Sequence, residues 1–129
     1  MKEMTNEWFK AAKDDLDTIE EIIKEEHLTN IVAFHAQQAV EKCFKAILEE
    51  HEIEIVKIHK LETLLGKLED HIQFEIDLQL IKRLDEVYIE ARYPVDIGLL
   101  PSGKPSIEEA NEFYKFARNI FYGIKNNLT

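Results

Sequence analysis

The spacing of apolar residues constrains the fold of this 129-residue chain more than any other feature of its sequence. Along most of the chain, apolar residues recur every three or four positions, so they share one face of an α-helix that turns about 100° per residue. A helix with one apolar face has to bury that face against another element. The pattern predicts an all-α fold, an antiparallel up-and-down helical bundle of about five helices forming a single domain over 1–129.

The breaks in the pattern indicate where each helix lies. The first carries Phe9 to Ile23, the second runs from Thr29 or Asn30 to about Glu50, and a short third begins near Lys60. The fourth covers about Asp77 to Arg92, and the last opens at Ser106. The predicted core residues are Phe9, Ala12, Leu16, Ile19, Ile23, Val32, Ala36, Ala39, Val40, Cys43, Ile47, Leu61, Leu64, Leu65, Leu68, Leu80, Ile81, Leu84, Val87, Tyr88, Ala91, Ala110, Phe113, Ala117, Ile120 and Ile124.

Small polar residues predict the helix starts. Thr5 or Asn6 is placed to cap the first helix, and Thr29 or Asn30 the second. Ser106 followed by Glu109 has the capping-box spacing, in which each side chain satisfies a free amide of the other residue.

Two segments are predicted to be irregular. Residues 51–58 alternate weakly in polarity, but a lone strand cannot satisfy its own backbone groups, so we interpret them as a connector. Pro94 ends the fourth helix, because the residue before a proline avoids the helical region. The surface loop Pro94–Pro105 then holds all three prolines of the chain.

The composition limits the class of protein. The formal net charge of −10 disfavours coating nucleic acid through a broad basic surface. Cys43 is the single cysteine, which rules out an intrachain disulfide. The first residues lack the apolar centre of a signal peptide, and no run reaches the ~20 apolar residues of a membrane helix. We expect a cytoplasmic protein that does not associate with membranes.

The second predicted helix carries a polar stripe beside its apolar face. His35, Gln38, Lys42 and Lys45 follow one another at steps of three, four and three. These steps place an imidazole, an amide and two ammonium groups within about a quarter-turn of one another, as a site for an anionic ligand would need. Three structural alternatives remain: a satisfied interior histidine, an ordinary i,i+4 pair of Glu41 with Lys45, and a stripe that is only an interface.

Arg92 is a second candidate for ligand binding. It lies in the sequence Tyr88-Ile89-Glu90-Ala91-Arg92-Tyr93-Pro94, at a helix end beside the predicted loop. There it could hold phosphate, with Tyr88 or Tyr93 stacking on a base. Alternatively, the arginine complements the negative end of the helix dipole. No HExxH, Cys/His cluster or glycine-rich phosphate loop occurs, so no metal and no cofactor are predicted.

Three blocks together resemble the HEPN (higher eukaryotes and prokaryotes nucleotide-binding) domain family. They are the Phe34–Ala46 stretch with its polar stripe, the sequence His59-Lys60-Leu61, and Ala91-Arg92-Tyr93-Pro94, and the similarity spans about Trp8 to Ile124. The resemblance implies a bundle of about five helices, often dimeric, paired with a minimal nucleotidyltransferase in toxin–antitoxin-like modules. It also implies a nucleotide or RNA ligand near His35, Gln38, Lys42, His59 and Arg92.

One departure from the wider group concerns catalysis. Ribonucleolytic members use an arginine followed four to six residues later by a histidine, but all three arginines here follow the last histidine, His71. Three functions stay open: a nucleotide-binding or partner module, a toxin-like ribonuclease with a rearranged site, and a structural helical adaptor. We predict that the second and fourth helices lie beside each other and bring His35 and Gln38 towards Arg92, because each of these helices pairs a long apolar face with an adjacent polar cluster.

A homodimer is also predicted from the aromatic residues of the last helix. Five of them, at positions 113, 114, 116, 121 and 122, encircle that helix. A helix that is apolar nearly all round has to bury more than one face.

Overall fold

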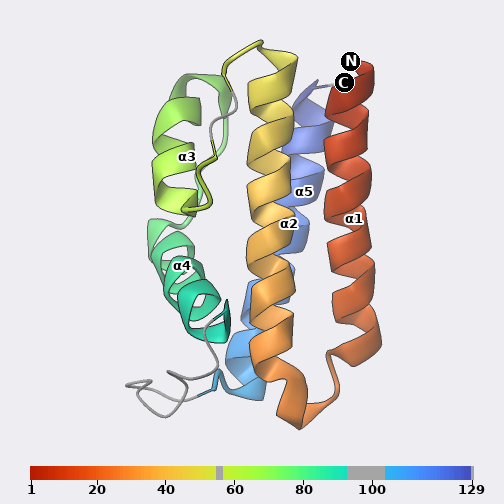
Figure 1. Cartoon of the computed structure of the whole chain (residues 1–129), viewed down its shortest axis with the longest axis vertical. Coiled ribbons are helices and arrows are strands. Elements are labelled where there is room, and N and C mark those ends of the chain that lie inside the picture. Colours follow the sequence, from red (N-terminus) through yellow and green to blue (C-terminus); the bar gives the residue numbers. More distant parts are fainter. Residues whose placement is uncertain (55–56, 93–103, 129) are drawn as a thin grey trace.

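The chain folds into a bundle of helices, seen here in a computed structural model that describes residues 1–54, 57–92 and 104–128, with 89–92 described in backbone only. The helices are α1 (Glu3–Ile22), α2 (Thr29–Glu50), α3 (Leu61–Leu68), α4 (Leu78–Arg92) and α5 (Ile107–Leu128), and short 3₁₀ turns cover Glu26–Leu28 and Glu69–His71. The long helices α1, α2, α4 and α5 alternate in direction along the chain (Figure 1). The described residues contain no strand, which confirms the all-α prediction.

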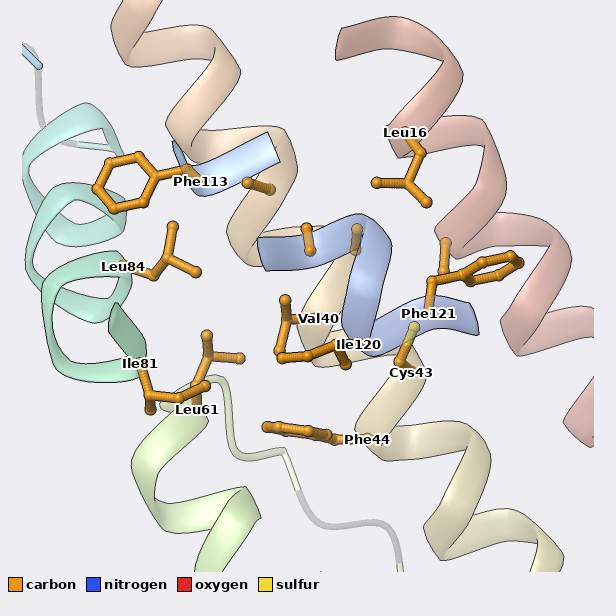
Figure 2. Packing of buried hydrophobic residues seen from close by; sticks show 14 of the residues in the cluster. Leu16, Val40, Cys43, Phe44, Leu61, Ile81, Leu84, Phe113, Ile120 and Phe121 are labelled. Carbon is orange, nitrogen blue, oxygen red and sulfur yellow. The ribbon is translucent and has the colours of Figure 1, made fainter. Parts of the chain in front are cut away.

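The core lies around α2, which packs against α1, α3, α4 and α5. Figure 2 shows Val40 of α2 and Ile120 of α5 in the middle of the buried cluster, with Leu84 of α4 on one side and Leu16 of α1 on the other. The three-four spacing therefore identified the buried faces correctly. Ile23, Leu65 and Leu80 are only partly buried and pack at the edge of this core. Tyr88 is also only partly buried, and the Ala91 side chain is outside the described residues.

The start of α1 differs from the prediction. The helix begins at Glu3, and Thr5 lies inside its first turn, fully buried. Instead of capping its own helix, the Thr5 hydroxyl donates to Glu50 Oε1 of α2 at 3.0 Å, and the backbone N–H of Lys2 donates to the same oxygen at 3.0 Å. A side chain at the end of one helix thus satisfies the start of another, because the two helices are antiparallel neighbours.

The predicted cap of α2 is also wrong. The helix begins at Thr29 after Leu28, and no side chain caps its first turn. At its other end the backbone N–H of Ile53 donates to the carbonyl of Leu48 at 2.8 Å, and Glu52 N–H to Glu49 at 3.2 Å. This Schellman arrangement turns the chain out of the helix. The described parts of the predicted connector 51–58 contain neither helix nor strand, as expected.

Asp85 of α4 holds the start of α3. Its buried carboxylate accepts the backbone N–H of Leu61 at 2.8 Å and that of Glu62 at 3.1 Å. Burial raises the pKa of Asp85, and these two hydrogen bonds oppose that rise. The contact fixes α3 against α4 through backbone groups that its own helix leaves free.

The capping box of α5 forms on one side only. Ser106 Oγ accepts the backbone N–H of Glu109 at 3.0 Å, as predicted. The Glu109 carboxylate instead accepts Nε and Nη2 of Arg83 at 2.9 and 3.2 Å. An arginine of α4 has replaced the local partner because its planar group grips both carboxylate oxygens. Of the loop Pro94–Pro105, residues 94–103 lie outside the described residues.

The aromatic residues of α5 do not all face outward. Phe113 and Phe121 are buried in the core of the bundle, whereas Tyr122 is 46% exposed. The expectation of a homodimer therefore draws its support from Tyr114, Phe116 and Tyr122 alone. Among the described residues, no helix has the length and apolarity needed to cross a membrane.

Candidate functional site

A buried carboxylate on α1 organises the polar stripe of α2. Asp15 Oδ1 lies 2.9 Å from Nδ1 of His35, and Asp15 Oδ2 lies 2.7 Å from Nζ of Lys42. The Asp15 side chain is only 10% exposed, while those of His35 and Lys42 are 24% and 25% exposed. We call these three residues the Asp15 cluster. Its two α2 side chains are predicted site residues, and both remain in contact with solvent, so both can meet a ligand.

Helix periodicity explains how the Asp15 cluster forms. His35 and Lys42 are seven residues apart, so two helical turns place them on the same side of α2. Asp15 lies on the buried stripe of α1 between Ala12 and Ile19, both fully buried. The interface between α1 and α2 thus brings the carboxylate to the two α2 side chains.

Aromatic contacts bring the end of α4 to the start of α2. Phe34 stacks on Tyr88 of α4 with ring centroids 5.6 Å apart and an interplanar angle of 20°. The His35 ring meets the same Phe34 edge to face at 5.3 Å. Helices α2 and α4 are therefore adjacent, as predicted, and Arg92 is the last residue of α4. The Arg92 side chain and the whole of Tyr93 lie outside the described residues, so their part in the site stays a prediction.

A second polar cluster contains Lys45 and His59. Glu41 Oε2 accepts a hydrogen bond from Lys45 Nζ at 2.9 Å and lies 3.4 Å from His59 Nδ1. The side chains of Glu41 and Lys45 are only 5% and 9% exposed, while that of His59 is half exposed. The Lys45 ammonium also lies 5.6 Å from the centre of the Trp8 ring. In the structure, the buried Glu41 is therefore the partner of Lys45, and the histidine that shares this carboxylate is His59, not His35.

Gln38 reaches this second cluster through its neighbour. Its Nε2 donates to Gln37 Oε1 at 2.8 Å, and Gln37 Nε2 donates to the backbone carbonyl of His59 at 2.9 Å. Because Gln37 is fully buried, its polar groups need partners within the protein. Its hydrogen bond to the His59 carbonyl ties the segment before α3 to α2.

Charge balance determines what the Asp15 cluster can do. The Asp15 carboxylate compensates the Lys42 ammonium, so protonated His35 is the member that would add net positive charge. When Nδ1 of His35 carries a proton and donates it in a hydrogen bond to Asp15, the other ring nitrogen, Nε2, is left to exchange a proton with a ligand. Burial raises the pKa of the Cys43 thiol, and the Asp15 charge adds to that rise, so both disfavour the thiolate form of this fully buried residue.

Asp15, Glu41 and Gln37 were not among the predicted site residues. For Asp15 the sequence holds one signal, an acidic residue inside an otherwise apolar stripe formed by Ala12, Leu16 and Ile19. Such a residue requires a cationic or hydrogen-bonding partner on the neighbouring helix. The partner itself cannot be deduced from that signal.

Comparison with known proteins agrees with the fold. The family model of the HEPN domain matches residues 5–127. A protein of Methanocaldococcus jannaschii named "Putative toxin MJ1304" is 32% identical over 133 aligned positions, which cover 94% of this chain and 86% of that protein.

Two solved structures share the fold. The crystal structure of TT1696 from Thermus thermophilus has a TM-score of 0.75 at 23% identity, covering 95% of this chain and 97% of that one. The crystal structure of ST0689, described as an archaeal HEPN homologue, has a TM-score of 0.71 at 24% identity and covers both chains in full.

Proposed function

Because this chain belongs to the HEPN domain family, we propose that it is a toxin-like module whose Asp15 cluster binds the phosphate of a nucleotide or RNA. The observation that carries this proposal is the pairing of His35 and Lys42 through one buried carboxylate while both side chains stay partly exposed. Asp15 holds the two donors at fixed positions, so little side-chain freedom is lost when a ligand binds. The similarity to a relative named as a toxin supports the biological role.

The partners follow from the same proposal. A minimal nucleotidyltransferase would act with this module, and a second copy of the chain would complete a homodimer, as the family resemblance implies. Arg92 would complete the anion site from the end of α4, beside the stacked rings of Phe34 and Tyr88.

Binding measurements test the proposal. Purified protein is titrated with nucleoside monophosphates and short RNA, alone and with a nucleotidyltransferase partner. His35→Ala should weaken binding, while His27→Ala, which changes an exposed histidine in the turn before α2, should leave it unchanged. Equal affinities for the wild type and both variants would exclude the Asp15 cluster as the site.

RNA cleavage is the second candidate function. It is favoured by the contact between Asp15 and His35, because a carboxylate that orients an imidazole is a common arrangement for general acid–base chemistry. Cleavage of RNA that is lost in His35→Ala and kept in His27→Ala would support it. Cleavage that survives in His35→Ala would assign the activity to a different site or to a contaminant.

A further inference from the structure

We propose that a pocket between α1 and α5 binds a small aromatic anion. This cavity of about 330 Å³ is lined by one face of each helix, namely Asn6, Phe9, Lys10 and Lys13 of α1 and Phe121, Tyr122 and Lys125 of α5. Its volume lies near the lower end of the ~300–1,000 Å³ range of small-molecule sites, so it fits a small molecule better than a polymer.

The α1–α5 pocket is separate from the Asp15 cluster. Asp15 follows Lys13 by two residues, which places it roughly 200° further round α1. The pocket is also near one end of the bundle, where the start of α1 and the end of α5 lie together (Figure 1). A ligand in this pocket would thus not compete with one at the Asp15 cluster.

The charge of the lining favours an anion. Three lysines line the pocket, and no carboxylate occurs among the described residues that line it, although the whole chain has a formal net charge of −10. Lys10 pairs with Glu7 at 3.3 Å, and Lys13 pairs with Asp17. Both pairs lie at the surface, where such contacts are weak, so a bound anion can replace them.

The ring contacts favour an aromatic group on that anion. Phe121 meets Phe9 edge to face at 5.8 Å and Tyr122 at 5.0 Å. The half-exposed Tyr122 can pack against a ligand ring, while the Lys125 ammonium lies 5.5 Å from the Phe121 centroid. A molecule with both a ring and an acidic group would engage both kinds of residue at once.

Four probes separate these two contributions in titrations of the full chain. Phenyl phosphate and phenylacetate carry both the ring and the charge, inorganic phosphate carries only the charge, and benzyl alcohol only the ring. At least one aromatic anion should bind about tenfold more tightly than either single-feature probe. The tighter of the two identifies the acidic group as a phosphate or a carboxylate. The proposal would be overturned if inorganic phosphate or benzyl alcohol bound as tightly as the aromatic anions, or if neither aromatic anion bound.

Matched variants locate the site. The double variant Lys10→Gln/Lys13→Gln and the single variant Tyr122→Ala should each weaken binding about tenfold. Lys24→Gln/Lys115→Gln removes two exposed lysines outside the pocket and should change nothing. Lys42→Gln should also leave this binding intact, so failure of the Asp15 cluster proposal would not affect this one. Equal affinities in the pocket variants and the Lys24/Lys115 control would refute the assignment.

Discussion

The carboxylate of Asp15 on α1 and the ammonium of Lys42 on α2 form an ion pair of 2.7 Å at the edge of the core. His35 approaches the other oxygen of the same carboxylate at 2.9 Å. One acidic side chain therefore both joins two helices and positions the two polar groups to which we assign ligand binding.

We expect the Asp15–Lys42 pair to be energetically coupled. Asp15→Asn should reduce the free energy of unfolding by about 1–3 kcal/mol, because Lys42 and His35 lose a charged acceptor in a partly buried place. Combining it with Lys42→Met should cost less than the sum of the two single changes. Urea unfolding of the four proteins measures this coupling. Strict additivity would show that the contact contributes nothing to stability.

Arg92 should contribute more than Lys42 to phosphate binding. A guanidinium can grip two phosphate oxygens, whereas Lys42 acts as a point charge that Asp15 already engages. Arg92→Ala should weaken binding of the preferred nucleotide roughly ten- to a hundredfold and leave the melting temperature nearly unchanged. Calorimetric titration and thermal unfolding of both alanine variants check this. Equal affinities of the wild type and both variants, or loss of the fold in Arg92→Ala, would show that Arg92 has a structural role and does not bind the ligand.

Two helical glycines should respond oppositely to alanine. A Cβ at Gly66 would meet nothing within 4 Å, so Gly66→Ala should stabilise the protein by up to about 1 kcal/mol. A Cβ at Gly123 would lie 2.9 Å from Cζ of Phe74. Gly123→Ala should therefore destabilise, because overpacking costs about 1–3 kcal/mol. Adding Phe74→Leu should recover part of that loss, and no recovery in chemical denaturation would disprove the steric explanation.

The contact between Glu50 and the start of α1 should make stability depend on pH. The backbone N–H of Lys2 holds the pKa of Glu50 below its usual range, and the Thr5 hydroxyl lowers it further. A carboxyl with a lowered folded-state pKa stabilises the fold above its unfolded pKa and loses that contribution as the pH falls through the folded value. Glu50→Gln should therefore cost about 1 kcal/mol at neutral pH and progressively less below pH ~4.3.

Glu49→Gln is the matched control for this measurement. Glu49 precedes Glu50 on the same helix and makes neither of these two contacts. Denaturant unfolding from neutral pH into the acid range should show a pH-dependent difference from wild type for Glu50→Gln only. A difference that stays constant with pH would exclude the charge of Glu50 as its cause.

The family assignment and the helix pattern were both accessible from the sequence. Three features carried the resemblance: the polar stripe that begins at His35, the residue His59, and the sequence Arg92-Tyr93-Pro94. The family model confirms it over residues 5–127. The apolar spacing predicted each helix and most of the core, because a period of 3.6 residues is a local property that any sufficiently long helix expresses.

Tertiary structure decided the partners of the polar side chains. Asp15 meets His35 and Lys42, Glu50 accepts hydrogen bonds from the start of α1, and the Glu109 carboxylate pairs with Arg83 instead of Ser106. In each case the two residues are 20 or more positions apart in the chain. Such pairs depend on how the helices are rotated and shifted along one another, and burial of the whole apolar core sets those rotations. Local spacing can place a residue on a helix face, but only the packed bundle determines which side chain it meets there.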